Sequence, residues 1–409
     1  MQRILSGYRT VTVLALLFLM VGCASVTPSK EPDQIRLVPK SFAELPGWTD
    51  DSVEEILPAL MASCKQVLAK RDSDPMPVPT LATYSLGLVK DWRPICLSAE
   101  SLESSDRRRV FQYFQYWFRP YLVAGDSGPE GLFTGYYESE LRGSLIRKNQ
   151  FQYPIYGMPN DIIAINLGDF SGDLLGQKSA GRIVKGRFVP YYSRSEIEQG
   201  SLKDQKLEIL YVDDPVDAYF MAVQGSGRVM LEDGSVVRLG YAGSNGHPYV
   251  SIGTILVKSG EIPLEKVSMK SIRDWLKAHP ESQDSLLNTN PSYVFFRQIV
   301  VKSSESQIGP IGAAGINLTS GRSLAVDRNY IALGLPMWLD LGESFGDSAH
   351  DKGLIQRLVM AQDTGGAIRG TVRGDLFFGF GTEAAAMSGS MRRRGNYYIF
   401  LPKSVPQTF

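Results

Sequence analysis

The sequence has few of the residues that bind metal ions. Only three histidines, His247, His279 and His350, occur in 409 residues, and they lie far apart. No CxxC or HExxH spacing is present, so the chain lacks the ligands of a dedicated zinc site. The segment GFGTEA at 379–384 has the spelling of a dinucleotide-binding turn, but too little chain follows it for a βαβ unit. We therefore expect neither a metal ion nor another cofactor.

The chain also lacks an excess of charge of one sign. Lysine plus arginine equal aspartate plus glutamate at 43 each, and no long basic run occurs, so we expect no nucleic-acid partner. With 43% hydrophobic and 21% charged residues, the composition is that of an ordinary globular protein and excludes disorder or a fibre. The length allows a large core and two domains.

An apolar run from Val11 to Val21 follows two arginines and is too short to span a bilayer comfortably. It ends in LMVGCAS, which resembles a bacterial lipoprotein signal. The resemblance implies that residues 1–22 are removed and that Cys23 becomes the lipidated first residue. A plain secretory signal or an N-terminal anchor is the alternative. Ala24 stands where an aspartate would often direct inner-membrane retention, so we expect the protein at the periplasmic face of the outer membrane.

The lipidated Cys23 and a polar linker, together residues 23–40, would hold the rest of the chain away from the lipid surface. Two cysteines then remain, Cys64 and Cys96. Because the periplasm is oxidising, we expect a disulfide between them, which closes a loop of about 30 residues and stabilises the fold by roughly 2–4 kcal/mol. The alternative is two buried thiols, since cysteine is among the most buried residue types.

Helical periodicity is confined to a few segments. Apolar residues recur at helical spacing over 53–68, and an aromatic stripe does so over 110–121. From Gly131 onward, including 209–231, short runs alternate apolar and polar residues between glycines, prolines and asparagines, as in a barrel or sandwich. One helix, around 269–278, interrupts these strands. The pattern predicts a mainly β fold with helices.

Several blocks of the sequence resemble one family and follow the family's order. They are GLFTGYYE, YFMAVQGSGRVML, LGYAGSNGHPYVSIG, NPSYVFFR and QDTGGAIRGTVRGDLFFGFGTEA, within a stretch from about residue 131 to 402. On these motifs the chain resembles membrane-bound lytic murein transglycosylase A. The resemblance implies a peptidoglycan lytic exotransglycosylase, a lyase that cleaves the β-1,4 bond between N-acetylmuramic acid and N-acetylglucosamine. The product would carry 1,6-anhydromuramic acid.

The resemblance also implies two domains separated by a groove. One, residues 41–138 and 293–409, would contain a double-psi β-barrel and carry the catalytic group. The other, residues 139–292, would be an inserted, β-rich and barrel-like domain that binds substrate. Peptidoglycan glycan strands would be the partner, and no partner protein can be named from the sequence.

The implied reaction needs a single acid/base residue. Ordinary glycosidases use two carboxyl groups, about 5–9.5 Å apart, because one protonates the leaving oxygen while the other attacks or activates water. In a lytic transglycosylase the C6 hydroxyl of muramic acid is the nucleophile, so one residue can donate a proton and then take one back. The resemblance assigns this role to Asp375 of RGDLFFG. We expect desolvation beside the apolar residues 376–378 to raise its pKa and keep it protonated.

Asp363, in the same glycine-rich block, is the second catalytic-site candidate, and its role is open. It could orient Asp375, bind a sugar hydroxyl, or hold the DTGG turn through backbone hydrogen bonds, and we favour structural support. As a second catalytic carboxylate it would make the protein a two-carboxylate peptidoglycan glycoside hydrolase, which is the alternative function. A binding lipoprotein without catalysis has no support, because Asp375 and its flanks are present.

Two other blocks supply the substrate-binding candidates. They are Tyr136 and Tyr137 of TGYYE, and Gln224, Ser226 and Gly227 of VQGSG. Amide and hydroxyl groups suit sugar hydroxyls and N-acetyl groups, and tyrosine rings offer flat apolar faces to a pyranose. The alternative for each tyrosine is core packing with a satisfied hydroxyl.

Overall fold

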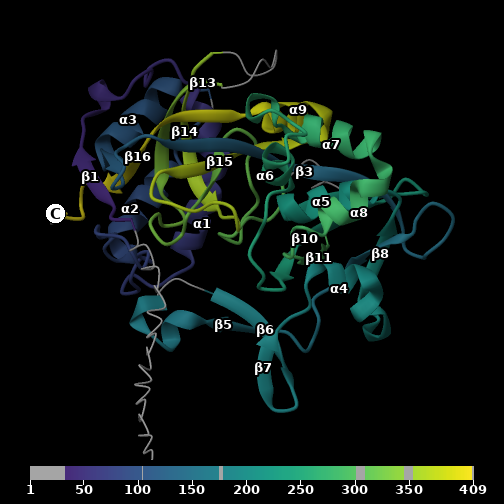
Figure 1. Cartoon of the computed structure of the whole chain (residues 1–409). Helices are drawn as coiled ribbons and strands as arrows, with labels where there is room; N and C mark the ends of the chain where they lie inside the picture. The colour runs from purple at the N-terminus through teal and green to yellow at the C-terminus, as the bar shows by residue number, and fades with distance from the viewer. Residues whose placement is uncertain (1–32, 104, 175–177, 301–308, 345–352, 408–409) are drawn as a thin grey trace, which may run out of the picture. The chain divides into compact units, whose positions relative to one another are not determined.

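Strands dominate the fold, as Figure 1 shows for the computed structural model of the chain. The structure describes residues 33–103, 105–174, 178–300, 309–344 and 353–407. The expected signal peptide and Cys23 lie outside these residues. Within them, the mainly β class with helices is confirmed. No helix in the described part of the chain is long and apolar enough to cross a membrane.

Six strands pair with one another in a closed ring. In order around the ring they are β16 (Arg392–Pro402), β13 (Pro336–Ser344), β14 (Ile355–Asp363), β12 (Ser323–Val326), β15 (Arg373–Phe380) and β3 (Gly131–Ser144). β3 closes the ring by pairing with β16, where Thr134 lies opposite Arg392. β16 also pairs with β2 (Phe118–Ala124), which pairs with β1 (Arg36–Pro39). The largest apolar core belongs to this ring and includes Phe133, Leu324, Leu358, Leu376 and Ile399.

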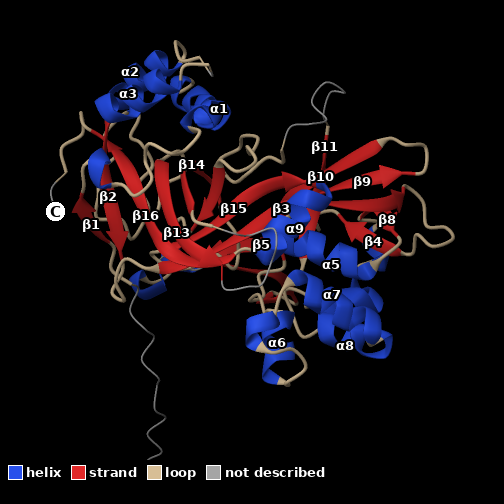
Figure 2. Ribbon diagram, turned by 90° about the horizontal axis from the view of Figure 1, so that it is seen from above, coloured by secondary structure: helices blue, strands red, loops and turns tan. Residues whose placement is uncertain are grey.

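The long strand β3 continues from this ring into a second group of strands (Figure 2). Its C-terminal half pairs in parallel with β9, and β10 and β11 follow in order. On its other side β3 pairs with β8, which pairs with β4. A second apolar core, which includes Leu141, Leu210 and Val229, lies among these strands. Their bounds are β4 Tyr153–Tyr156, β8 Glu208–Val212, β9 Ser226–Leu231, β10 Val236–Ser244 and β11 Val294–Ile299.

A third sheet is small and separate. It consists of β5 (Ile163–Asn166), β6 (Lys178–Val184) and β7 (Arg187–Pro190), all antiparallel. None of its strands pairs with a strand of the other groups among the described residues. In Figure 1 β6 and β7 form a hairpin that extends away from the neighbouring elements.

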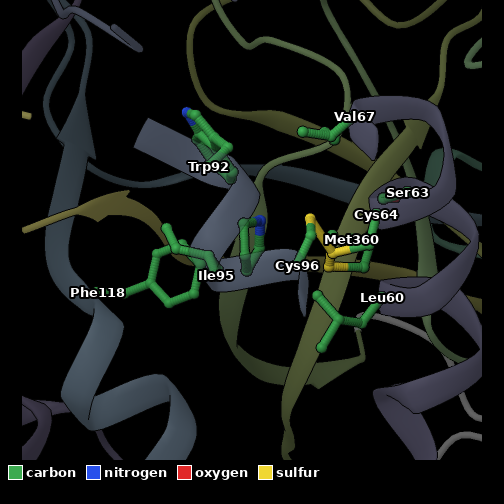
Figure 3. A pocket seen from close by; sticks show the side chains of 11 residues that line it. Leu60, Ser63, Cys64, Val67, Trp92, Ile95, Cys96, Phe118 and Met360 are labelled. Atoms are coloured by element: carbon green, nitrogen blue, oxygen red, sulfur yellow. A yellow bond between two sulfur atoms is a disulfide. The ribbon is translucent and has the colours of Figure 1, made fainter. Parts of the chain in front are cut away.

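The helices α1 (Leu57–Leu68), α2 (Val89–Ala99) and α3 (Arg107–Trp117) pack against the core of the ring. The structure joins Cys64 of α1 to Cys96 of α2 by a disulfide, with 5.1 Å between their Cα atoms. Figure 3 shows the bond among apolar side chains that include Leu60, Ile95 and Met360. Both cysteines are buried, so the bond fixes α1 to α2 from within.

The structure corrects one helix boundary. The aromatic stripe over 110–121 is helical only as far as Trp117, and Phe118–Ala124 is strand β2. Pro120 explains the change, because proline disfavours the helical conformation at the residue before it. The predicted segment 53–68 begins as a 3-10 helix and continues as α1. The helix around 269–278 is confirmed as α7 (Met269–Ala278).

The expectation of strands throughout 209–231 is wrong in its middle, which forms helix α5 (Pro215–Gln224). The Asp214 carboxylate caps this helix by accepting the Val216 N–H at 2.7 Å, and Gly225 ends it in the left-handed conformation at φ 82°. Apolar residues are frequent in this helix, so the sequence can be fitted by an alternating pattern as well as by a helical one. The remaining helices are α4 Arg194–Glu196, α6 Ile252–Lys258, α8 Gln283–Leu287 and α9 Gly381–Ser390.

Candidate active site

The two candidate aspartates lie in one row across four neighbouring strands. Asp375 of β15 lies opposite Thr134 of β3 on one side and opposite Ala325 of β12 on the other. Ala325 in turn lies opposite Asp363 of β14. Residues paired in this way share a face of the sheet. Two strand spacings place the Cα atoms of the aspartates about 10 Å apart, with only a methyl side chain between them in the row.

The alternation of β15 directs Asp375 away from the core of the ring. Leu376 is fully buried in that core, so its neighbours Asp375 and Phe377 face the opposite side. On that side Phe377 and Tyr136 belong to a separate small apolar cluster. The apolar residues after Asp375 therefore desolvate the carboxyl group from its flank rather than enclosing it in the main core.

Asp375 is partly accessible and accepts one hydrogen bond among the described residues. The Thr134 hydroxyl donates to its Oδ1 at 2.5 Å. Burial raises the pKa of Asp375 to about 6, and the negative charge of Asp363 adds to the rise. The charge of Arg373 and the hydrogen bond from Thr134 oppose this rise in the pKa. The carboxyl group can therefore carry its proton to a much higher pH than an exposed aspartate and act as a general acid.

Asp363 ends β14, and both of its oxygens accept hydrogen bonds. The Tyr136 hydroxyl donates to Oδ2 at 2.7 Å, and the Ala313 N–H donates to Oδ1 at 2.9 Å. Burial raises the pKa of Asp363, whereas the hydrogen bonds from Tyr136, Ala313 and Thr364 lower it. With both oxygens engaged, Asp363 is suited to hold the tyrosine and the loop around Ala313 in place.

Tyr136 joins β3 to Asp363 across the row. Its ring packs against Phe377, with 5.2 Å between the ring centroids, and only a small part of it is exposed. Burial and the charges of Asp363 and Asp375 raise the pKa of Tyr136 well above its usual value. The hydroxyl therefore stays protonated and remains a donor to Asp363.

Thr134 and Arg373 are residues of the site that the sequence reasoning missed. An Arg373 guanidinium N–H donates to the Thr134 hydroxyl oxygen at 2.8 Å, and that hydroxyl donates to Asp375. Burial lowers the pKa of Arg373, and the charge of Asp375 raises it. Each residue lies two positions before a predicted one, Thr134 before Tyr136 and Arg373 before Asp375. Since residues two apart on a strand share a face, this spacing was the available signal.

The other predicted binding residues lie where α5, β3 and β9 meet. Gln224, at the end of α5, accepts the Tyr137 N–H at 3.0 Å, and Tyr137 is buried. Ser226 begins β9 and is also buried. Gly227 packs on Met221, whose sulfur would lie 2.4 Å from a Cβ at this position. The structure thus joins Tyr137 to Gln224, and it gives Ser226 and Gly227 packing positions.

A buried ion cluster, also missed, lies further along β3. Glu138 accepts the Arg228 Nε–H at 2.7 Å on one carboxylate oxygen and an Arg238 guanidinium N–H at 3.1 Å on the other. The Arg228 guanidinium lies 3.6 Å from the centroid of the Phe380 ring. Phe380 ends β15 and pairs with Glu138, so the cluster ties the strand that carries Asp375 to β9 and β10.

The carboxylates of the site do not form a metal-binding cluster. Asp363 uses its oxygens on O–H and N–H donors, and Asp375 uses one oxygen on a hydroxyl. Within the part of the chain that the structure describes, no three or more His, Cys, Asp or Glu residues lie together where they could hold a metal ion.

Two family models match the chain. The MltA specific insert domain matches residues 132–297, and the 3D domain matches residues 322–401. The first segment includes Thr134, Tyr136 and Glu138, and the second includes both aspartates of the row. The site is therefore built from both matched segments.

The proteins and solved structures to which the chain is similar are named as membrane-bound lytic murein transglycosylases or as MltA. The chain is 31% identical to the membrane-bound lytic murein transglycosylase A of Vibrio cholerae over 319 residues. These residues are 77% of each chain. The crystal structure of a membrane-bound lytic murein transglycosylase from Agrobacterium tumefaciens is 32% identical, with a TM-score of 0.76 over 90% of this chain and 98% of that one. Escherichia coli MltA with bound chitohexaose is 26% identical, with a TM-score of 0.59 over 92% and 96%. The chain belongs to the membrane-bound lytic murein transglycosylase A family.

Proposed function

We propose that this protein is a peptidoglycan lytic transglycosylase with Asp375 as its single acid/base. It cleaves the β-1,4 bond between N-acetylmuramic acid and N-acetylglucosamine and leaves 1,6-anhydromuramic acid at the new end. Family membership supports the reaction class. The observation that carries the assignment is the position of Asp375, which is desolvated, has a pKa raised to about 6, and accepts only a neutral hydroxyl among the described residues.

The proposed reaction uses one proton twice. Asp375 first protonates the glycosidic oxygen, and the bond from that oxygen to C1 of muramic acid breaks. The C6 hydroxyl of the same sugar then attacks C1 and gives its proton to the Asp375 carboxylate, which restores the starting state. Thr134 holds Oδ1 throughout, so Oδ2 is the oxygen that transfers the proton.

Asp363 has a supporting role in this proposal. A two-carboxylate hydrolase would need Asp363 to attack C1 or to activate a water molecule with a free carboxylate oxygen. Both oxygens of Asp363 already accept hydrogen bonds, from Tyr136 and from the Ala313 N–H. We therefore assign Asp363 to the positioning of Tyr136 and of the loop that contains Ala313.

The substrate is proposed to bind between two domains. The closed ring of six strands is consistent with a double-psi β-barrel in residues 41–138 and 293–409. The second strand group supports an inserted domain over 139–292. A glycan strand would lie in a groove between them, shaped by Tyr136, Tyr137, Gln224, Ser226 and Gly227. The bound chitohexaose in the E. coli relative supports an oligosaccharide ligand.

The proposed location is the periplasmic face of the outer membrane, with Cys23 as the lipidated residue after removal of 1–22. The relatives are named as membrane-bound, which supports attachment to a membrane. The mass of the amino-terminal peptide tests this part, because a diacylglyceryl and an acyl group on Cys23 differ clearly from an uncleaved or unmodified terminus.

A pair of variants tests the catalytic proposal on purified sacculi. Asp375→Asn keeps shape and hydrogen bonding but has no acidic proton, so the rate should fall by 10²-fold or more, on the order of general acid–base contributions. Asp363→Asn should cost less activity, because it removes support rather than the acid. The product should be lighter than the hydrolysis product by one water. A folded Asp375→Asn enzyme with near-native activity, or a reducing-end product, would overturn the proposal.

A further inference from the structure

The small sheet of β5, β6 and β7 has one exposed apolar face. Ile163 pairs with Gly181 across β5 and β6, and Ile183 pairs with Phe188 across β6 and β7. Because Gly181 and Ile183 are two apart on one strand, all four residues share a face. Ile163 is 41% exposed, Ile183 55% and Phe188 43%, which is unusual for large apolar side chains gathered on one surface.

The opposite face of this sheet packs on the rest of the protein. Ala180 is buried, and Gly246 lies so close that a Cβ there would be 2.2 Å from the Ala180 nitrogen. The Arg182 guanidinium lies 3.6 Å from the centroid of the Tyr192 ring and donates to its hydroxyl at 2.7 Å. The sheet is therefore held from one side, and its apolar face is presented outward.

The turn of the β6–β7 hairpin carries positive charge beside this apolar face. Lys185 and Gly186 form the turn with φ of 50° and 76°, and Arg187 follows it, opposite Val184 and so on the other face of the hairpin. Both basic residues are exposed, and the segment 183–190 contains no acidic residue. Apolar side chains flanked by lysine and arginine are the composition by which peripheral proteins bind an anionic lipid surface.

A second exposed apolar pair has a different setting and serves as a comparison. Leu145 and Ile146, after the end of β3, are 59% and 63% exposed. The nearby Lys148 is paired with Glu232, whereas the exposed Arg147 donates to the neutral Gln152 side chain at 2.9 Å. Among the described residues, the hairpin therefore has two basic side chains without an acidic partner, and this site has one.

The proposed anchor would keep the hairpin near a bilayer. Ten residue steps separate Cys23 from Asp33, the first described residue, and an extended chain of this length reaches at most about 35 Å. A lipid on Cys23 would thus hold Asp33, the first described residue of the folded body, within that distance of the membrane surface. This proximity raises the effective concentration of lipid around any exposed apolar and basic surface.

We infer that the β6–β7 hairpin docks on an anionic phospholipid surface. Ile183 and Phe188 enter the boundary between head groups and acyl chains, and Lys185 and Arg187 contact the phosphates. The docking adds a second attachment to the proposed lipid on Cys23, and it rests on that part of the proposed function. Two attachments fix the orientation of the catalytic body relative to the membrane, which a flexible tether alone does not.

The full lipidated chain, reconstituted into phosphatidylcholine and phosphatidylglycerol vesicles, tests this inference. Ile183→Cys, on the apolar face, carries an environment-sensitive apolar fluorophore, and Ile146→Cys carries the same label as the matched control. We expect brominated lipids to quench the label at 183 severalfold more than the label at 146. Adding Lys185→Glu and Arg187→Glu should lower the quenching of the 183 label by on the order of tenfold. Vesicles of phosphatidylcholine alone should quench it less.

The outcomes separate the hairpin from the anchor. Equal quenching at both positions, or none at 183 in protein that floats with the vesicles, would overturn the docking. An unquenched label at 183 with cross-links between copies would assign the face to self-association and also overturn it. The mass of the amino-terminal peptide from the same preparation reports the lipid independently. A lipidated, floating protein with an unquenched hairpin removes only the docking, whereas an unmodified chain that does not float removes both.

Discussion

Glu138 and Asp375 lie on neighbouring strands, but their surroundings differ in charge. Glu138 is buried and accepts hydrogen bonds from two guanidinium groups, those of Arg228 and Arg238, one on each oxygen. Asp375 accepts a hydrogen bond only from the neutral hydroxyl of Thr134 among the described residues. One carboxylate is fully compensated by positive charge, and the other is desolvated without direct ion pairing.

The difference shows how one sheet can hold one carboxylate paired with arginines and another with a raised pKa. Arg373 lies near Asp375, but its hydrogen bonds among the described residues go to Thr134 and to the carbonyl oxygens of Leu132 and Gly374. Its charge lowers the pKa of Asp375 without reversing the effect of burial, and the pKa is about 6. A buried ion pair fixes strands in place, whereas an uncompensated carboxyl group remains able to exchange a proton near neutral pH.

Removing the charge of Glu138 should have the largest effect on stability. Glu138→Gln removes the negative charge that two buried guanidinium groups contact, and breaking a buried ion pair in this way costs about 3–5 kcal/mol in comparable sites. Glu140→Gln, at an exposed position two residues along β3, is the matched control and should change stability by less than about 0.5 kcal/mol. Denaturant unfolding measures both. Equal stability of the two variants would mean that the ion cluster has no structural role.

The disulfide gives a stabilising effect that involves no charge. Replacing Cys64 and Cys96 together by serine should lower the free energy of unfolding by roughly 2–4 kcal/mol. The specific activity of the folded fraction should not change, because neither cysteine lies in the row of aspartates. Unfolding under oxidising and reducing conditions provides the measurement. Wild-type protein that unfolds at the same denaturant concentration with and without reductant would contradict the expectation.

Asp375→Asn should stabilise the protein at neutral pH while it abolishes activity. Burial raises the pKa of Asp375 from 3.8 to about 6, so its ionisation opposes folding. The wild type should lose up to about 3 kcal/mol as the pH rises from below 4 through 6, and the variant should not. Thermal unfolding of wild type and variant at about pH 4 and about pH 7, on either side of the pKa of Asp375, tests the sign of this change in stability. A variant less stable than wild type at the higher pH would show that Asp375 is stabilised as an anion.

Thr134→Val should give the smallest effect, a shift in pH dependence. Valine keeps the shape of threonine but removes the hydrogen bond that lowers the pKa of Asp375. The pKa of Asp375 should therefore rise further, by on the order of one unit. Thr134→Ser keeps the hydroxyl and should leave the profile unchanged. Superimposable pH–rate profiles for valine and serine would exclude Thr134 as a positioning residue.

The sequence was informative where function restricts residue choice. The glycine-rich block located Asp375 and Asp363, and the structure places both on one face of the sheet. Alternation alone could not show that Thr134 and Arg373 connect to Asp375, because that link depends on which strands become neighbours. The same holds for Glu138, whose arginine partners come from two other strands.

Local patterns failed where two kinds of secondary structure fit one sequence. The segment 209–231 is apolar enough to satisfy both readings, and the helix start is marked mainly by the Asp214 cap and Pro215. Likewise, the aromatic stripe continues past Trp117 although the helix does not. The orientation of the small sheet could not be predicted from the sequence either. Ala180 is buried against a loop around Gly246, which is far away in the sequence.

The pH dependence of kcat/KM on soluble glycan strands tests the central claim most directly. If Asp375 is the single acid/base, activity follows its protonated form and falls above about pH 6 with unit slope. Because no second carboxylate has to be ionised, we expect no loss of activity at acidic pH from the protonation of Asp363. A kcat/KM that does not change through pH 6 would contradict the assignment of Asp375 as the single acid/base. So would a bell-shaped pH profile whose acidic limb disappears in Asp363→Asn.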